Sequence, residues 1–293
     1  MSLEFAKLHS LGNDFLIVRS GEAGDLPSSL SALAIGLCDR HRGVGADGVV
    51  FYQPTSSDSE AEAAAIIINA DGSKAEVSGN GLRCLAAFLN ASGIHPGETL
   101  RIRTVVGVRT YRLEAVKNGT YIYESCMGRP VLEPSLVPAQ LDGSPGLVID
   151  HPLEIATGVV RVSVCSLGNP HCSTFWSELA QAPVETIGPL LERHRAFPRR
   201  TNVEFVQVLD RHSLRVRFWE RGVGLTMASG TGVSAAAVAS ILRGLVESPV
   251  SVYTELGSMS VTWRPGEDLF LIGPAEFICQ GSYIPGSDAL EPA

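Results

Sequence analysis

The segments SGNGLRCLAAFLN (residues 78–90) and SGTGVSAAAVASIL (residues 229–242) are two copies of one pattern, and this repetition decides the fold. In each, a Ser-Gly-x-Gly turn opens an apolar, alanine-rich run, and the two turns are 151 positions apart. The tetrapeptide SLGN also occurs twice, at residues 10–13 and 166–169, in the same order. Recurrent Gly-rich turn chemistry can produce one such match by itself. Two matches at similar offsets indicate an internal duplication instead.

The residues around these turns predict many strands and few helices in each half. Runs of β-branched and aromatic residues predict strands at residues 15–19, 49–53 and 64–69 and, in the second half, at 159–165, 172–176, 204–209 and 213–219. Helices are expected at 30–39, 82–90, 183–195 and 233–243, a two-strand pattern at 100–124, and a closing strand pair at 250–254 and 259–263. The fold class is therefore α/β (α+β), with two pseudo-symmetric domains that are each a curled sheet or open barrel around a central helix.

Composition limits the classes of function. The chain has 293 residues, of which 45% are hydrophobic and 18% charged, and this is enough to bury two domain cores. Its net charge of −8 argues against a nucleic-acid partner, and no apolar run reaches the roughly 20 residues of a membrane-spanning helix. The opening MSLEFAKLHS lacks the apolar stretch of a signal peptide, and the six cysteines, without a CxxC spacing, fit reduced thiols. We therefore expect a cytoplasmic protein, and the seven scattered histidines, without HxH or HExxH, predict no metal site.

The two Ser-Gly-x-Gly turns can bind an anion. A helix start presents unpaired backbone N–H groups at the positive end of the helix dipole, and these bind carboxylate or phosphate without a cationic side chain. If the two domains place their helix starts opposite one another across an interdomain cleft, one anionic group can lie between them. Serine is also an ordinary N-cap residue, so a single turn would indicate capping alone. The duplicated pair, beside matched polar segments, favours an active site in the cleft.

A different Gly-rich stretch, residues 43–48 (GVGADG), satisfies the GxGxxG pattern. It follows a predicted helix and precedes the strand VVFYQ, whereas the dinucleotide fingerprint requires a strand, then the turn, then a helix. Because the order is reversed, we reject a dinucleotide site.

An ordered series of short motifs carries a resemblance to a known family. The series is LGNDF (11–15), GVGADG (43–48), NADGS (69–73), SGNGLRC (78–84), SLGNPHC (166–172), TNVEF (201–205), ERGVG (220–224) and SGTG (229–232). In this order the set resembles the diaminopimelate epimerase family of cofactor-independent amino-acid racemases and epimerases, over nearly the whole chain. The resemblance implies an N-terminal domain of residues 1–127 plus about 277–293, a C-terminal domain of residues 128–276, and an active site between them.

The family uses two cysteines as acid and base, each of which begins a CGNG or CGTG turn, and the matching positions here hold Ser78 and Ser229. A thiol has a pKa near about 8.5, which a helix N-terminus lowers further, so a thiolate forms near neutral pH. A serine hydroxyl is a far weaker acid and serves as a base only when a neighbouring general base takes its proton. Leu225 also stands where the family commonly has glutamate, which indicates a natural departure rather than a laboratory Cys→Ser exchange.

The other family positions are intact. The resemblance assigns His171 and Glu220 as a pair that supports the second acid/base, at Ser229. The positions that hold the substrate's remote amino-acid group are Asn13, Asn69, Asn169, Asn202, Glu220 and Arg221. The helix-start donors for the reacting carboxylate are Gly79, Asn80, Gly230 and Thr231. Taken singly, these residues also have ordinary structural explanations, such as asparagine in a turn.

The resemblance implies an isomerase that interconverts LL- and meso-diaminopimelate, in lysine and peptidoglycan precursor synthesis, by two-base proton transfer at one carbon. Neither pyridoxal phosphate nor a metal is expected, and Ser78 and Ser229 form the acid/base pair with help from His171 and Glu220. The expected partner is a small amino-acid substrate, with a homodimer left open. Two alternatives remain: a dehydratase or isomerase on the same fold, for which one weak base suffices, and an amino-acid-binding homologue without catalysis. A metal hydrolase is disfavoured because the chain has no motif for one.

Overall fold

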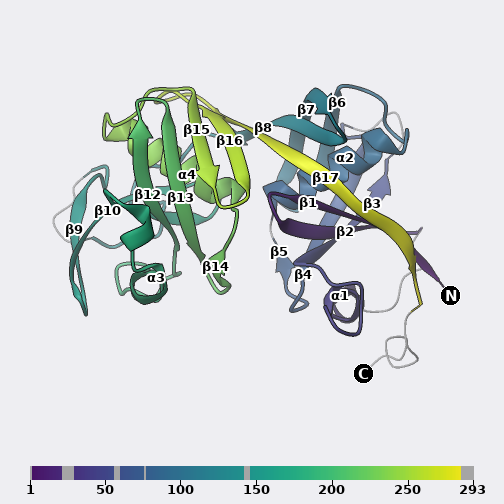
Figure 1. The fold of residues 1–293 in the computed structure, drawn as a ribbon, viewed down its shortest axis with the longest axis horizontal. Coiled ribbons are helices and arrows are strands. Elements are labelled where there is room, and N and C mark those ends of the chain that lie inside the picture. Colours follow the sequence, from purple (N-terminus) through teal and green to yellow (C-terminus); the bar gives the residue numbers. More distant parts are fainter. Residues whose placement is uncertain (1, 22–29, 56–59, 76, 142–145, 285–293) are drawn as a thin grey trace. The chain divides into compact units, whose positions relative to one another are not determined.

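The computed structural model describes residues 2–21, 30–55, 60–75, 77–141 and 146–284, and the chain divides into two compact units. Unit 1 comprises Met1–Ser125 and Gly273–Ala293, and unit 2 comprises Cys126–Ile272. Strands dominate both units, and Figure 1 shows them curling around one helix in each. Among the described residues, no helix is both long and apolar enough to cross a membrane.

Unit 1 is a curled sheet with a helix on each face. Its elements are β1 (Leu3–Ser10), β2 (Asn13–Arg19), α1 (Leu30–Cys38), β3 (Gly48–Pro54), β4 (Ala63–Asn69), β5 (Lys74–Ala75), α2 (Gly79–Ala91), β6 (Thr99–Thr104), β7 (Gly107–Lys117), β8 (Thr120–Gly128) and most of β17 (Leu269–Tyr283). The order of paired strands is β17–β1–β2–β3–β4–β6–β7–β8, with β5 as a short extra strand on β4. Because β17 also pairs with β8, the strands form a ring.

The two faces of this sheet explain why its central strands are apolar without interruption. Phe15 and Ile17 of β2 belong to the core around α2, whereas Leu16 and Val18 belong to the core around α1. Successive side chains of a strand point to opposite faces, so a strand covered on both faces needs an apolar residue at every position. α2 is therefore the central helix of unit 1, and α1 lies on the outer face.

Unit 2 repeats this plan. Its elements are β9 (His151–Ile155), β10 (Gly158–Ser166), β11 (Pro170–Phe175), a short 3₁₀ turn (Leu179–Gln181), α3 (Val184–Glu192), β12 (Asn202–Asp210), β13 (Ser213–Glu220), β14 (Gly224–Thr226), α4 (Gly230–Leu242), β15 (Val250–Thr254), β16 (Gly257–Thr262) and the start of β17. The order of pairing is β9–β10–β11–β12–β13–β15–β16–β17, with β14 as the short extra strand on β13. In both units the parallel pairs fall at the same two steps, β2–β3 and β4–β6 in one and β11–β12 and β13–β15 in the other. The duplicated α+β fold expected from the two Ser-Gly-x-Gly turns is confirmed.

Several local expectations differ from the structure. α2 and α4 begin at Gly79 and Gly230, before the expected residues 82 and 233, because the glycines already belong to the first turn. The helix expected at 183–195 ends at Glu192. Residues 100–124 form parts of three strands rather than two, with turns at both of the sequence breaks. Strands β1 and β17 were not expected, although they pair with each other along almost the whole of β1.

The GVGADG stretch lies between α1 and β3, and its backbone N–H groups cap the C-terminal end of α1. The backbone N–H of Gly43 donates to the carbonyl of Asp39 at 2.9 Å, and those of Val44 and Gly45 donate to the carbonyl of Leu37 at 3.0 and 2.9 Å. These bonds satisfy carbonyls that a helix end leaves without a partner. Gly45 has a φ of 80°, a left-handed conformation that favours glycine.

Candidate active site

The helix starts of α2 and α4 have matching geometry. Ser78 caps α2 with φ −133° and ψ 112°, and Ser229 caps α4 with φ −140° and ψ 118°. The Ser78 hydroxyl accepts the N–H of Gly81 at 3.1 Å, and the Ser229 hydroxyl accepts the N–H of Gly232 at 3.3 Å. Each serine therefore acts as an N-cap, and its hydroxyl oxygen lies at the positive end of a 13-residue helix.

The second glycine of each turn is explained by packing. A Cβ atom at Gly81 would lie 3.2 Å from the ring of Phe15, and one at Gly232 would lie 2.8 Å from the ring of Phe218. Gly79 is different, because a Cβ atom there would have nothing within 4 Å. Packing among the described residues therefore does not explain the glycine at position 79.

Ser229 has a carboxylate beside it. Its hydroxyl donates to Glu220 Oε2 at 3.3 Å, and the hydroxyl of Thr226 donates to Glu220 Oε1 at 2.6 Å. Burial raises the pKa of Glu220, and the two hydroxyl hydrogen bonds lower it only in part. The carboxylate is consequently a stronger proton acceptor than an exposed glutamate. Among the described residues, no carboxylate hydrogen-bonds Ser78.

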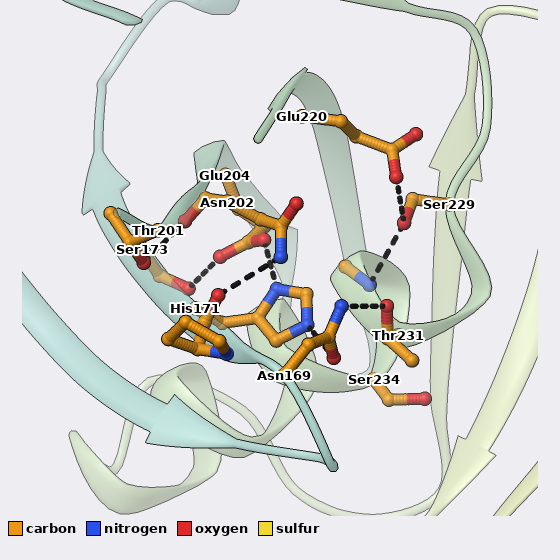
Figure 2. A network of polar contacts seen from close by, with 12 residues as sticks. Asn169, His171, Ser173, Thr201, Asn202, Glu204, Glu220, Ser229, Thr231 and Ser234 are labelled. Carbon is orange, nitrogen blue, oxygen red and sulfur yellow. Dashed lines mark hydrogen bonds and ion pairs between the residues drawn. The ribbon is translucent and has the colours of Figure 1, made fainter. Parts of the chain in front are cut away.

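His171 lies in a buried polar network on the neighbouring strands (Figure 2). Its Nδ1 is 2.6 Å from Glu204 Oε1, and its Nε2 is 2.9 Å from Asn169 Oδ1. Asn169 Nδ2 is in turn 3.5 Å from the hydroxyl of Thr231, the second residue of α4. His171 and Glu220 were expected to act as a pair, but each has different hydrogen-bond partners.

Asn202 holds the turn that carries Arg221. Its Oδ1 accepts the backbone N–H of Arg221 at 3.0 Å, and its Nδ2 donates to the carbonyl of Pro170 at 2.9 Å. The carboxylate of Glu192, only 2% exposed, accepts the N–H of Gly222 at 3.0 Å. Two buried side chains thus position the turn after β13. The Arg221 guanidinium is exposed and donates one hydrogen bond, to the carbonyl of Arg199 at 3.2 Å.

Asn13 and Asn80 of unit 1 are brought together. Asn13 Oδ1 accepts from Asn80 Nδ2 at 3.1 Å, and Asn13 Nδ2 donates to Asp47 Oδ2 at 2.7 Å. Asn80 Oδ1 accepts from Arg83, which is fully buried, at 3.1 Å. Asn69 is held separately by Ser73, at 3.0 Å.

Sequence reasoning did not assign several residues of these networks. Asp47, Arg83 and Glu204 each lie inside a quoted motif, GVGADG, SGNGLRC or TNVEF, but the motif does not show what the side chain contacts. Glu192 lies outside all of the quoted motifs. Among the described residues, no group of three or more His, Cys, Asp or Glu side chains could hold a metal ion.

Comparison with known proteins agrees with the motif series. The profile of the diaminopimelate epimerase family matches residues 5–133 and 163–278. Diaminopimelate epimerase of Pelotomaculum thermopropionicum is 42% identical over 281 residues, covering 96% of this chain and 99% of that protein. Diaminopimelate epimerase of Synechococcus elongatus is 42% identical over 282 residues, covering 96% and 98%.

A solved structure shows the same fold at much lower identity. A PhzF-family phenazine biosynthesis protein from Bacillus anthracis aligns with a TM-score of 0.69 at 14% identity, over 97% of this chain and 100% of that one. That likeness concerns the fold alone. The profile match over both halves of the chain, and the two relatives that it matches over nearly their full length, show that the chain belongs to the diaminopimelate epimerase family.

Proposed function

We propose that the chain is a cofactor-independent amino-acid epimerase that interconverts LL- and meso-diaminopimelate, with Ser78 and Ser229 as its acid/base pair. Family membership supports the reaction class. The observation that carries the proposal for these serines is the contact between the Ser229 hydroxyl and the Glu220 carboxylate at 3.3 Å. A serine acts as a base only when a neighbouring group takes its proton, and Glu220 is such a group.

The proposed proton transfers balance as follows. The Ser229 oxygen takes the α-hydrogen of the substrate while the hydroxyl proton of Ser229 passes to Glu220. The backbone N–H groups of the helix start stabilise the negative charge that develops on the α-carboxylate. Ser78 then delivers a proton to the other face of the α-carbon, so that the configuration inverts. Ser78 regains a proton from solvent and Glu220 releases one to solvent, which restores the starting state.

Hydrogen exchange in heavy water tests the proposal directly. With diaminopimelate as the ligand, an epimerase incorporates deuterium at the α-carbon and forms the other stereoisomer, which NMR and chiral chromatography detect. Tight binding without exchange would instead support a binding protein. Formation of a keto or unsaturated product would support a dehydratase. Either of these results would contradict the proposed epimerase.

The pH dependence of the exchange rate should reflect the ionisation of Glu220. If Glu220 must be ionised, the exchange rate rises as pH increases through its pKa, and burial places that pKa above the ordinary 4.5. Glu220→Gln should lower the rate by about 10²-fold or more and remove this acid limb. Thr226→Val, a variant of nearly the same shape, removes a hydrogen bond that lowers the pKa of Glu220, so the limb should move to higher pH. An unchanged limb in both variants would assign it to another group.

Arg221 should determine the preference for a second carboxylate. Its guanidinium can bind a carboxylate through two parallel N–H···O hydrogen bonds, and lysine cannot form this bidentate contact. Arg221→Lys should therefore weaken binding of diaminopimelate by roughly ten-fold or more, and binding of a monoamino monocarboxylic acid much less. Calorimetry measures both affinities. Arg199→Lys is the matched control, because it makes the same change nearby and keeps the carbonyl that Arg221 contacts. Equal losses for both ligands would remove Arg221 from the remote-carboxylate site.

A further inference from the structure

Glu204 is a buried carboxylate to which the proposed mechanism gives no role. It is 1% exposed and lies on β12, in register with Ser173 of the parallel strand β11. Both of its oxygens are used: Oε1 lies 2.6 Å from Nδ1 of His171, and Oε2 accepts the Ser173 hydroxyl at 3.0 Å. His171 and Ser173 are two positions apart on one strand, so both side chains lie on the same face, toward Glu204 (Figure 2).

This arrangement determines where the hydrogens of the imidazole are. A carboxylate only accepts hydrogen bonds, so Nδ1 of His171 carries the hydrogen that points to Glu204. His171 is 0% exposed, so water does not compete for this bond. The ring nitrogen on the other side is Nε2, which lies 2.9 Å from Asn169 Oδ1. With hydrogen on Nδ1 alone, Nε2 only accepts, so this tautomer calls for a half-turn of the Asn169 amide that brings Nδ2 to Nε2 and Oδ1 to the Thr231 hydroxyl. Hydrogen bonds of this kind commonly set which nitrogen of a histidine remains for chemistry.

The contacts continue from the imidazole to the start of α4. The Asn169 side-chain amide links Nε2 of His171 to the hydroxyl of Thr231, since one end of the amide lies 2.9 Å from Nε2 and the other 3.5 Å from the hydroxyl oxygen. Thr231 is the second residue after the cap Ser229. A change of tautomer or rotation of the His171 ring would therefore alter the hydrogen bonds available to Asn169 and, through Asn169, to Thr231.

We infer that Glu204 is a positioning residue for proton transfer at Ser229. It holds His171 in the tautomer with hydrogen on Nδ1, which directs Nε2 to Asn169 and orders the start of α4. The inference rests on the proposed function in one respect, that proton transfer occurs at this helix start. Glu204 itself does not touch substrate in this scheme, and its effect reaches the reaction through His171.

Two substitutions at Glu204 separate its charge from its volume. Glu204→Gln keeps the shape but loses the ionised acceptor, whereas Glu204→Asp keeps an ionised acceptor on a shorter side chain. Selective ¹⁵N labelling of the seven histidines, with His171 assigned from a His171→Gln variant, reads the tautomer by NMR. We expect hydrogen on Nδ1 in the unchanged protein and in Glu204→Asp, and loss of this tautomer in Glu204→Gln.

The kinetic readout uses α-hydrogen exchange in heavy water. Glu204→Gln should lower kcat by at least about ten-fold, because an imidazole in the wrong tautomer is a poor partner in proton transfer. KM should change much less, and Glu204→Asp should recover part of kcat. Ser173→Ala is the matched control: it removes the hydroxyl from the other oxygen of the same carboxylate and should leave the His171 tautomer as it is.

Three results would overturn the inference. They are an unchanged His171 tautomer in Glu204→Gln, an unchanged kcat despite a changed tautomer, and equal losses in Glu204→Gln and Ser173→Ala. If the unchanged protein shows no exchange with diaminopimelate, the proposed function fails by itself. The NMR comparison then still decides whether Glu204 holds His171, since it needs no turnover.

Discussion

Ser78→Cys combined with Ser229→Cys should raise the rate of α-hydrogen exchange on diaminopimelate by at least about ten-fold. A thiol has a pKa near about 8.5, and a helix N-terminus lowers it further, so a thiolate is populated at neutral pH where an alkoxide is not. Each single change should gain less than the pair. Of the two, Ser78→Cys should give the larger gain, because Ser229 already has Glu220 to take its proton. Exchange in heavy water, followed by NMR, measures all three variants.

The same variants allow a control for the position of the thiol. Ser92 is the C-cap of α2 and is exposed, so Ser92→Cys places a thiol at the negative end of the helix that Ser78 begins. At neutral pH the thiol at position 78 should react with iodoacetamide faster than the thiol at position 92, and only the former should affect exchange. If the double variant binds diaminopimelate but gains no exchange, base strength is not what limits the site. The exposed side chains of Leu225 and Met227 would then be the next departures to examine.

Gly43→Ala should destabilise unit 1 by about 3 kcal/mol, the upper part of the usual range for overpacking. A Cβ atom at residue 43 would lie 2.1 Å from the carbonyl oxygen of Gly36, 2.8 Å from that of Leu37 and 2.9 Å from that of Asp39. These are backbone atoms at the end of α1, so no flexible side chain can move aside. The hydrogen bond from Gly43 to Asp39 would have to break or lengthen. Urea unfolding followed by circular dichroism measures the loss as a lower midpoint.

Gly79→Ala is the matched control for this stability measurement. A Cβ atom at Gly79 meets nothing within 4 Å, and alanine has a better helix propensity than glycine. The midpoint for Gly79→Ala should stay at or slightly above that of the unchanged protein. Equal midpoints for Gly43→Ala and Gly79→Ala would show that the end of α1 accommodates a methyl group after all.

The fold could be predicted from the sequence because a Ser-Gly-x-Gly turn before an apolar run indicates a capped helix start, and this pattern occurs twice. β17 was missed for the converse reason. It is 15 residues long but contains Gly273 and Pro274, which read locally as a break. Its pairing with β1, at the other end of the chain, supplies the stability that local propensity does not.

Local sequence patterns likewise predicted only part of the candidate site. Ser78, Ser229 and Glu220 belong to motifs that could be matched residue by residue. Glu204 also lies in a motif, but a charged residue in a strand ordinarily faces water. Its partners are 33 and 31 positions away, and only the parallel pairing of β11 with β12 brings them together. Contacts that depend on strand register cannot be read from a single sequence.

The division of unit 1 between the two ends of the chain has a consequence for biosynthesis. Unit 2 is one continuous segment, so all of it has been synthesised before residues 273–283 are added. β1 is synthesised long before β17, yet its partners on one side are residues 276–283 of β17. Until then that side of β1 is an open edge, which is a template for pairing with other chains. A chain that ends at residue 272 therefore combines a complete unit 2 with an aggregation-prone unit 1.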